Sequence, residues 1–178
     1  FFPQLIAGPI VHYKEMMPQF IRNIIQKRGL QSENLAIGFS IFSIGLFKKI
    51  VLADSIGIFA NEVFGLAETN LVMLFFTSWA GLFAYAFQLY FDFSGYSDMA
   101  IGIARLFGIK LPLNFNSPYK ATSIAVFWRN WHMTFTRLIR SYIFDPISLA
   151  MTRLAVKSGY GNTRFFLITT VIPVMLTF

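Results

Sequence analysis

The sequence predicts an all-α fold: a multi-pass transmembrane helical protein with amphipathic helices at the membrane interface. Of its 178 residues, 56% are hydrophobic and only 13% are charged, whereas a soluble domain has about 25% charged residues. The 22 phenylalanines are also too many for one small soluble core. Intrinsic disorder requires low hydrophobicity and is therefore excluded. An integral membrane protein, or a piece of one, remains.

The two ends of the chain predict an internal fragment of a longer protein. Phe1–Val11 is apolar from its first residue and runs into a Gly-Pro turn, without the basic region that opens a signal peptide. Phe165–Phe178 is uncharged but only about 14 residues long, whereas a spanning helix needs about 20. Since no internal repeat or linker is visible, we expect residues 1–178 to form a single membrane domain, truncated at both ends.

Leu35–Ala60 is the first predicted membrane span, and it follows a basic loop, His12–Asn34. Lys48 and Lys49 interrupt its apolar run. A charged residue at the centre of a span costs about 2.5–3.5 kcal/mol unless snorkelling or water relieves it. Either the helix is interrupted at these lysines, or they face a polar cavity.

Leu71–Phe91 is the second and clearest predicted span, uncharged and separated from the first by a short acidic loop, Asn61–Asn70. The region Asp92–Arg164 is mixed and basic, and contributes to the excess of 15 Lys and Arg over 8 Asp and Glu. Two spans place both basic regions on one side of the membrane, and the positive-inside rule makes that side cytoplasmic.

Common catalytic and metal-binding signatures are missing from the sequence. It has no phosphate-binding glycine loop, no HExxH motif and no Gly-x-Ser-x-Gly elbow. Its two histidines are far apart in the chain, and it has no cysteine. We therefore expect no metal, no bound cofactor and no nucleic-acid partner.

The first polar cluster, Tyr90–Asp98, directly follows the second predicted span. Its candidate substrate-binding or supporting residues are Asp92, Ser94, Tyr96 and Asp98. Gly95 is expected to bend the chain and bring both carboxylates toward one cavity. In the alternative interpretation, Asp92 or Ser94 caps a helix over Tyr96–Phe107, and Asp98 pairs with Arg105 or a helix dipole. Spacing alone favours this structural alternative.

The second cluster is Leu111–Tyr119, an Asn- and Pro-rich turn. Asn114 and Asn116 could hydrogen-bond a substrate. Turn formation explains the same residues, and by itself is the preferred interpretation.

The third cluster begins at Phe127 and is expected to form one amphipathic helix through Tyr142. Its polar stripe comprises Arg129, His132 or Met133, Thr136 and Arg140; its apolar stripe comprises Phe127, Trp131, Phe135, Leu138 and Tyr142. An interfacial anchor is one interpretation. A catalytic site is the other, because the ordinary pKa of a histidine, about 6.5, suits a general base. The residues themselves leave these two alternatives open.

Together these stretches resemble the membrane-bound O-acyltransferase family, and most closely its bacterial branch of alginate O-acetyltransferases and teichoic-acid D-alanyl transfer proteins. The resemblance covers nearly the whole chain in order. It rests on FFPQLIAGPIVHY at 1–13, GLFKKIVLAD at 45–54, QLYFDFSGYSDMAIGIARLFGIKLPLNFNSPY at 88–119 and FWRNWHMTFTRLIRSYIFDPI at 127–147.

The resemblance implies a multi-pass enzyme of the bacterial cytoplasmic (inner) membrane that moves an acyl group to a hydroxyl of a cell-surface polysaccharide, as in alginate biosynthesis. The implied partners are a cytoplasmic thioester donor, expected to be acetyl-coenzyme A, the polysaccharide or an outer-face acyl-accepting protein, and membrane lipid. His132 matches the first of two family histidines and is the candidate catalytic residue. The second, in a Trp-His-Gly motif, is expected beyond residue 178, so the fragment alone is expected to be inactive.

Two departures from the family pattern leave the acceptor open. Asn130 replaces the second of two arginines before Trp-His, as in the teichoic-acid type, and Ser141 replaces an aspartate after Arg140. A histidine is expected to accept the proton of the acceptor hydroxyl while nearby donors stabilise the oxyanion. His132 would orient donor or acceptor, supported by Asn130, Arg129, Asn116 and Arg140. A transporter or channel and a non-catalytic membrane subunit are the alternatives.

Overall fold

The computed structural model describes residues 2–5, 8–25, 31–69, 74–158 and 165–171, and every regular element in these ranges is helical. This agrees with the all-α prediction. The chain divides into two compact units, Phe1–Asn116 and Ser117–Phe178, each considered by itself. The prediction of a single domain stays a prediction.

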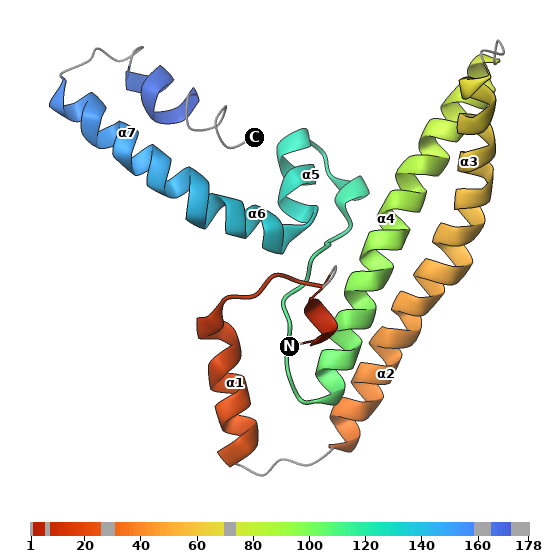
Figure 1. The fold of residues 1–178 in the computed structure, drawn as a ribbon, viewed down its shortest axis with the longest axis horizontal. Coiled ribbons are helices and arrows are strands. Elements are labelled where there is room, and N and C mark those ends of the chain that lie inside the picture. Colours follow the sequence, from red (N-terminus) through yellow and green to blue (C-terminus); the bar gives the residue numbers. More distant parts are fainter. Residues whose placement is uncertain (1, 6–7, 26–30, 70–73, 159–164, 172–178) are drawn as a thin grey trace. The chain divides into compact units, whose positions relative to one another are not determined.

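The first unit is built on a long helical hairpin. Its elements are η1 (Phe2–Gln4), α1 (Tyr13–Ile25), α2 (Ser32–Phe47), η2 (Lys48–Ala53), α3 (Asp54–Glu68) and α4 (Phe75–Leu106). The chain passes from α2 through η2 into α3 as one rod, and α4 returns antiparallel beside it (Figure 1).

The rod Ser32–Glu68 has 37 residues and is long and apolar enough to cross a membrane, because an 18-residue window within it has a mean hydropathy of 1.9. Among the described residues it alone meets that test. It contains the first predicted span, with a π-helical segment at the two lysines rather than a break. The predicted acidic loop at Asn61–Asn70 is wrong up to Glu68, because good helix formers such as Leu66 and Ala67 carry the helix onward.

Helix α4 runs unbroken for 32 residues, so the predicted bend at Gly95 is wrong. So is the alternative that Asp92 or Ser94 caps a new helix. Gly95 serves close packing instead, since a Cβ there would lie 2.7 Å from the carbonyl oxygen of Gly45. Small residues of this kind let two helices bring their backbones together.

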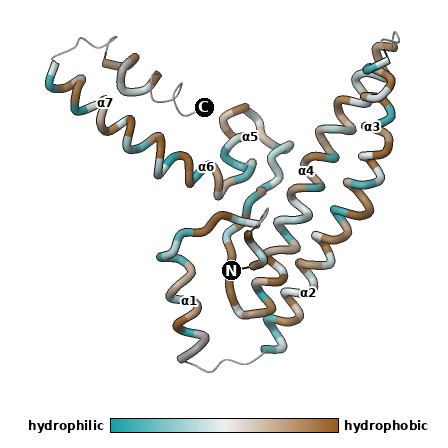
Figure 2. The backbone as a smooth tube through the Cα atoms, viewed as in Figure 1, coloured by the Kyte–Doolittle hydropathy of each residue, from teal (hydrophilic) through white to brown (hydrophobic). Residues whose placement is uncertain are grey.

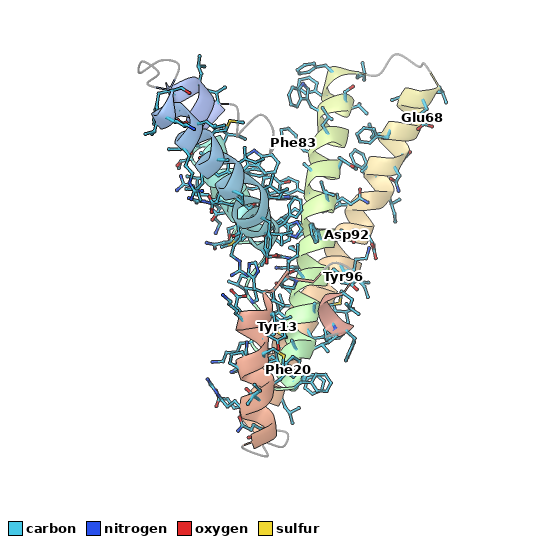
Figure 3. The ribbon with its side chains drawn as sticks, turned by 60° about the vertical axis from the view of Figure 1, so that its left-hand side comes forward. Tyr13, Phe20, Glu68, Phe83, Asp92 and Tyr96 are labelled. Carbon is cyan, nitrogen blue, oxygen red and sulfur yellow. The ribbon has the colours of Figure 1, made fainter. Side chains whose placement is uncertain are left out.

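The end of α4 is a Schellman turn. The amide of Gly108, which has φ 71°, donates to the Arg105 carbonyl at 2.9 Å, and the amide of Ile109 donates to the Ala104 carbonyl at 3.0 Å. The turn directs Ile109 and Leu111 into a small core with Met16, Ile101 and Ala104. Phe20 of α1, labelled in Figure 3, packs against this core.

Apolar side chains also cover the outside of the hairpin, where Figure 2 shows hydrophobic residues along α2, α3 and α4. Exposed examples are Ile50, Ile58, Phe76, Leu82 and Phe83. Large contiguous apolar surfaces are rare on soluble monomers. Such a surface suits contact with lipid, and more than one membrane crossing stays a prediction.

The second unit contains η3 (Pro118–Lys120), α5 (Ile124–Asn130), α6 (Met133–Ile139), η4 (Arg140–Phe144), α7 (Asp145–Lys157) and η5 (Leu167–Val171). α6, η4 and α7 continue one another (Figure 1). The predicted single helix from Phe127 to Tyr142 is wrong, because extended backbone at Trp131 and left-handed backbone at His132 separate α5 from α6.

Candidate active site

Both carboxylates of the first cluster form ion pairs with the two lysines of η2. Lys48 Nζ lies 2.6 Å from Asp98 Oδ2. Lys49 Nζ lies 2.6 Å from Asp92 Oδ1 and 2.8 Å from Asp54 Oδ1. The predicted partner of Asp98, Arg105, is therefore wrong. The sequence predicted either an interrupted helix at these lysines or a polar cavity in front of them. The helix continues through them as a π-helix, and they face carboxylates.

The π-helical form of η2 accounts for this pairing. A π-helix closes its hydrogen bonds over five residues rather than four, and the amide of Asp54 donates to the Lys49 carbonyl in this way. The extra residue changes which face the following side chains present. The two adjacent lysines thus pair with carboxylates of α4, and Lys49 also pairs with Asp54. Within an otherwise apolar rod, unpaired charges would be costly.

The other polar residues of this stretch of α4 differ in how far they are exposed to solvent. Ser94 and Ser97 are each 1% exposed, and neither hydroxyl has a hydrogen-bond partner among the described residues. Tyr96 is half-buried and lies one turn from Asp92 (Figure 3). Ser94 is thus enclosed by protein, whereas Asp92 keeps 49% of its side chain exposed.

The second cluster lies in irregular chain after α4. Phe115 packs edge-on against Tyr90 and Phe93, with ring centroids 5.8 and 5.0 Å away. These contacts hold the segment against α4. Asn114 is 2% exposed, whereas the candidate Asn116 is exposed to solvent. Asn116 therefore keeps an accessible amide, and its role stays a prediction.

His132 occupies the junction between α5 and α6. Its backbone is left-handed, with φ 43° and ψ 55°. Its carbonyl accepts from the amides of Phe135 at 3.0 Å and Thr136 at 3.1 Å, which starts α6. The imidazole stacks on the Phe135 ring with centroids 5.1 Å apart. A left-handed residue other than glycine is uncommon, and such backbone strain concentrates at functional sites.

Aromatic stacking supports the junction on its α5 side. Trp131 stacks on Phe127 with ring planes 18° apart and centroids 5.6 Å apart. Tyr119 contacts both rings, at 5.8 Å from Phe127 and 6.3 Å from Trp131. Ser123 caps α5 by accepting the amide of Val126 at 3.3 Å. The break at His132 is therefore anchored by packed side chains.

The remaining candidates of this cluster lie on either side of the junction. Asn130 is the last residue of α5 and is half-buried, two residues from His132. Arg129 is exposed, and its Nε donates to the Ala125 carbonyl at 3.3 Å. Arg140 Nε lies 3.7 Å from Asp145 Oδ1 in an exposed pair. Within the second unit, Asn130 is thus the predicted neighbour closest to His132 along the chain.

Burial lowers the pKa of His132 below its usual value of 6.5. Desolvation disfavours the charged imidazolium, so the ring is neutral at pH 7. A neutral imidazole can accept a proton or a hydrogen bond. Elsewhere in the described part of the chain, no group of three His, Cys, Asp or Glu could hold a metal ion. The arrangement is suited to proton transfer.

The ion pairs are the feature that sequence reasoning missed. The sequence showed that Lys48 and Lys49 would be costly in an apolar span, but it did not show which residues pair with them. The π-helical segment decides which face of the helix the two lysines occupy. The spacing of Lys49 and Asp54, five residues apart, was the available signal.

Comparison with known proteins gives one family. The model described as "MBOAT, membrane-bound O-acyltransferase family" matches residues 1–165. The chain is 54% identical over 147 residues to the Helicobacter pylori protein named "Peptidoglycan O-acetyltransferase". The aligned residues cover 83% of this chain and 27% of that protein.

Two further relatives carry other names. "Probable alginate O-acetylase AlgI" of Azotobacter vinelandii is 38% identical over 161 residues, with 90% of this chain and 30% of the relative covered. "Teichoic acid D-alanyltransferase" of Bacillus subtilis is 30% identical over 183 residues, with 94% and 42% covered. The chain thus spans less than half the length of these relatives.

Proposed function

Because this chain belongs to the membrane-bound O-acyltransferase family, we propose that it forms part of an enzyme that transfers an acetyl group from a thioester to hydroxyls of a cell-surface polysaccharide. The identities favour acetyl over D-alanyl transfer. They are 54% and 38% to relatives named for O-acetylation, against 30% to one named for D-alanyl transfer. Peptidoglycan and alginate are the first acceptors to test.

The observation that carries the catalytic assignment is the state of His132. It is half-buried, its burial keeps the imidazole neutral, and its left-handed backbone is anchored between two helices. Strained backbone of this kind persists only where surrounding packing enforces it. An interfacial anchor would not require it.

In the proposed reaction the acceptor hydroxyl attacks the thioester carbonyl. We assign His132 a larger role than the orienting one expected from the sequence: its neutral imidazole accepts a hydrogen bond from that hydroxyl and takes its proton as the new C–O bond forms. The C–S bond then breaks, and the leaving thiolate takes the proton from the imidazolium, which returns His132 to its neutral form. Asn130 is proposed to position the acceptor, and Arg129 and Arg140 to attract the anionic donor.

The proposed setting is the bacterial cytoplasmic membrane, spanned several times, with an acetyl-coenzyme A donor on the cytoplasmic side. The length and hydropathy of the rod Ser32–Glu68 and the exposed apolar side chains of the hairpin support this setting. The basic composition of the regions flanking the hairpin supports the cytoplasmic orientation of those regions. An outer-face protein that accepts the acetyl group belongs to the same proposal.

The test uses the full-length protein in native membranes, with radiolabelled acetyl-coenzyme A and either peptidoglycan or alginate. His132→Asn is the informative variant, because asparagine tolerates left-handed backbone but is not a base. We expect normal expression and loss of at least two orders of magnitude in transfer, since general base catalysis contributes about 10²–10⁴-fold. His12→Gln is the control and should transfer normally.

Three results would contradict parts of the proposal. Normal transfer by the His132→Asn variant would make His132 an anchor while keeping the enzyme. Solute flux in vesicles without donor consumption would favour a transporter. Transfer that depends on another membrane protein and tolerates every change in this chain would favour a non-catalytic subunit.

A further inference from the structure

A polar cavity of about 400 Å³ lies in the first unit, where the end of α1, the start of α2 and the end of α4 meet. Its lining residues are Gln19, Arg22, Gln31, Glu33, Asn34, Arg105, Gly108 and Lys110. It contains none of the candidate active-site residues. Its volume is within the range of about 300–1,000 Å³ typical of small-molecule sites.

Positive charge dominates this cavity. Arg22, Arg105 and Lys110 face a single acidic residue, Glu33. Among the residues that the structure describes, none of these three cations forms an ion pair. The Nε atom of Arg105 is buried and has no hydrogen-bond partner there. A buried guanidinium donor without an acceptor is costly, and a bound anion would supply the acceptor.

The walls are held by contacts that leave the cationic groups available. The side chain of Gln19 bridges to the backbone of Lys110 twice, donating to its carbonyl at 3.1 Å and accepting from its amide at 2.8 Å. The Schellman turn at Gly108 fixes the same segment from the α4 side. The cavity is therefore shaped before any ligand binds.

The first turn of α2 adds backbone amides, which carry partial positive charge and so have the same sign as the three cations. Gln31 precedes α2 without capping it through its side chain. Its Oε1 instead accepts from the side-chain Nδ2 of Asn34 at 3.0 Å. The early amides of a 16-residue helix carry the positive end of its dipole. Arginine side chains and a helix N-terminus converging on one space are a combination that binds phosphate.

We propose that this cavity binds a phosphate group at the membrane surface. The exposed side chains of Ile21 and Phe107 (49% and 53%) belong to the same two helix ends, α1 and α4, and suit the border between headgroups and hydrocarbon. An anionic phospholipid headgroup and a soluble phosphate-bearing molecule such as coenzyme A present the same chemistry. The coenzyme A arm alone rests on the proposed function.

The experiment measures equilibrium binding to the purified full-length protein in detergent, by calorimetric titration with three probes. These are dihexanoyl phosphatidylglycerol, dihexanoyl phosphatidylcholine and coenzyme A. The test variant is Arg22→Gln/Lys110→Gln, which spares the half-buried Arg105. The matched control is Arg153→Gln/Lys157→Gln, which removes the same two charges from exposed positions of α7.

We expect the test variant to raise the dissociation constant of phosphatidylglycerol or coenzyme A at least tenfold, equivalent to about 1.4 kcal/mol, with less than twofold change in the control. A change for phosphatidylglycerol identifies a lipid headgroup site, and a change for coenzyme A identifies a soluble ligand. The proposal is overturned if no probe binds, or if both variants change binding equally while melting like the parent protein. Because binding is read without turnover, a failure of acetyl transfer leaves this result intact.

Discussion

Replacing Gly45 by alanine should force apart the two helices of the hairpin. A Cβ at this position would lie 2.6 Å from the Gly95 carbonyl oxygen and 2.7 Å from the Met99 amide nitrogen. Both are backbone atoms, which cannot rotate away as a flexible side chain could. To restore an ordinary contact, taken as about 3.4 Å, α2 and α4 would have to separate locally by several tenths of an ångström.

The expected cost follows from this geometry. Overpacking a tight interface costs about 1–3 kcal/mol. The separation also strains the ion pair between Lys48 and Asp98. Lys48 lies only three residues after Gly45 in the same rod, and its Nζ is 2.6 Å from Asp98 Oδ2. Gly65 is the matched control, because nothing lies within 4 Å of its Cβ position. Alanine there should stabilise α3 by about 0.5–1 kcal/mol through helix propensity.

The assay is denaturation of the full-length protein in mixed micelles, followed by tryptophan fluorescence, with both variants and the parent compared. Gly45→Ala should lower the free energy of unfolding, and Gly65→Ala should leave it unchanged or raise it. Equal stability of the two variants would refute the close backbone contact of α2 and α4.

Three further predictions concern the charges and the helix junction. Lys48→Met should leave the largely buried Asp98 without this ion pair and lower the free energy of unfolding by about 1–3 kcal/mol, whereas Lys48→Met/Asp98→Leu should recover most of the loss in the same denaturation assay. Ser123→Ala should cost about 1 kcal/mol through the lost cap of α5, and Ser123→Asp should not. The lowered pKa of His132 means that the unfolded chain binds the proton more readily, so stability should fall as pH drops below 6.5, and His132→Gln should flatten that decline in melting curves recorded from pH 7.5 to 5.

Composition and periodicity were sufficient for the large elements. The apolar run from Leu35 to Ala60 and the aromatic run from Leu71 onward predicted two long helices, and the described parts of both are helical. Their ends were predicted poorly. Helix propensity carries α3 past Asn61 to Glu68, and Gly95, a helix breaker in water, is a packing residue between two apolar helices.

The local backbone around the candidate site could not be predicted from side-chain pattern. Between Phe127 and Tyr142 the spacing of polar and apolar residues fits one continuous helix, yet the chain turns at Trp131 and His132. The stacking of Trp131 on Phe127 and the packing of Tyr119 against both depend on residues before α5. Such contacts outweigh the periodicity of a short segment.

The structure separates the sequence candidates by how their polar groups are satisfied. Asp92 and Asp98 have lysine partners within the hairpin, which accounts for charged residues beside an apolar rod without any substrate. His132 differs from these two carboxylates in its backbone and in its charge. Its conformation opposes the continuous helix that its neighbours favour, and its burial keeps it uncharged at neutral pH. A residue held in strained backbone is the stronger candidate for chemistry, because stability alone would have favoured glycine or asparagine there.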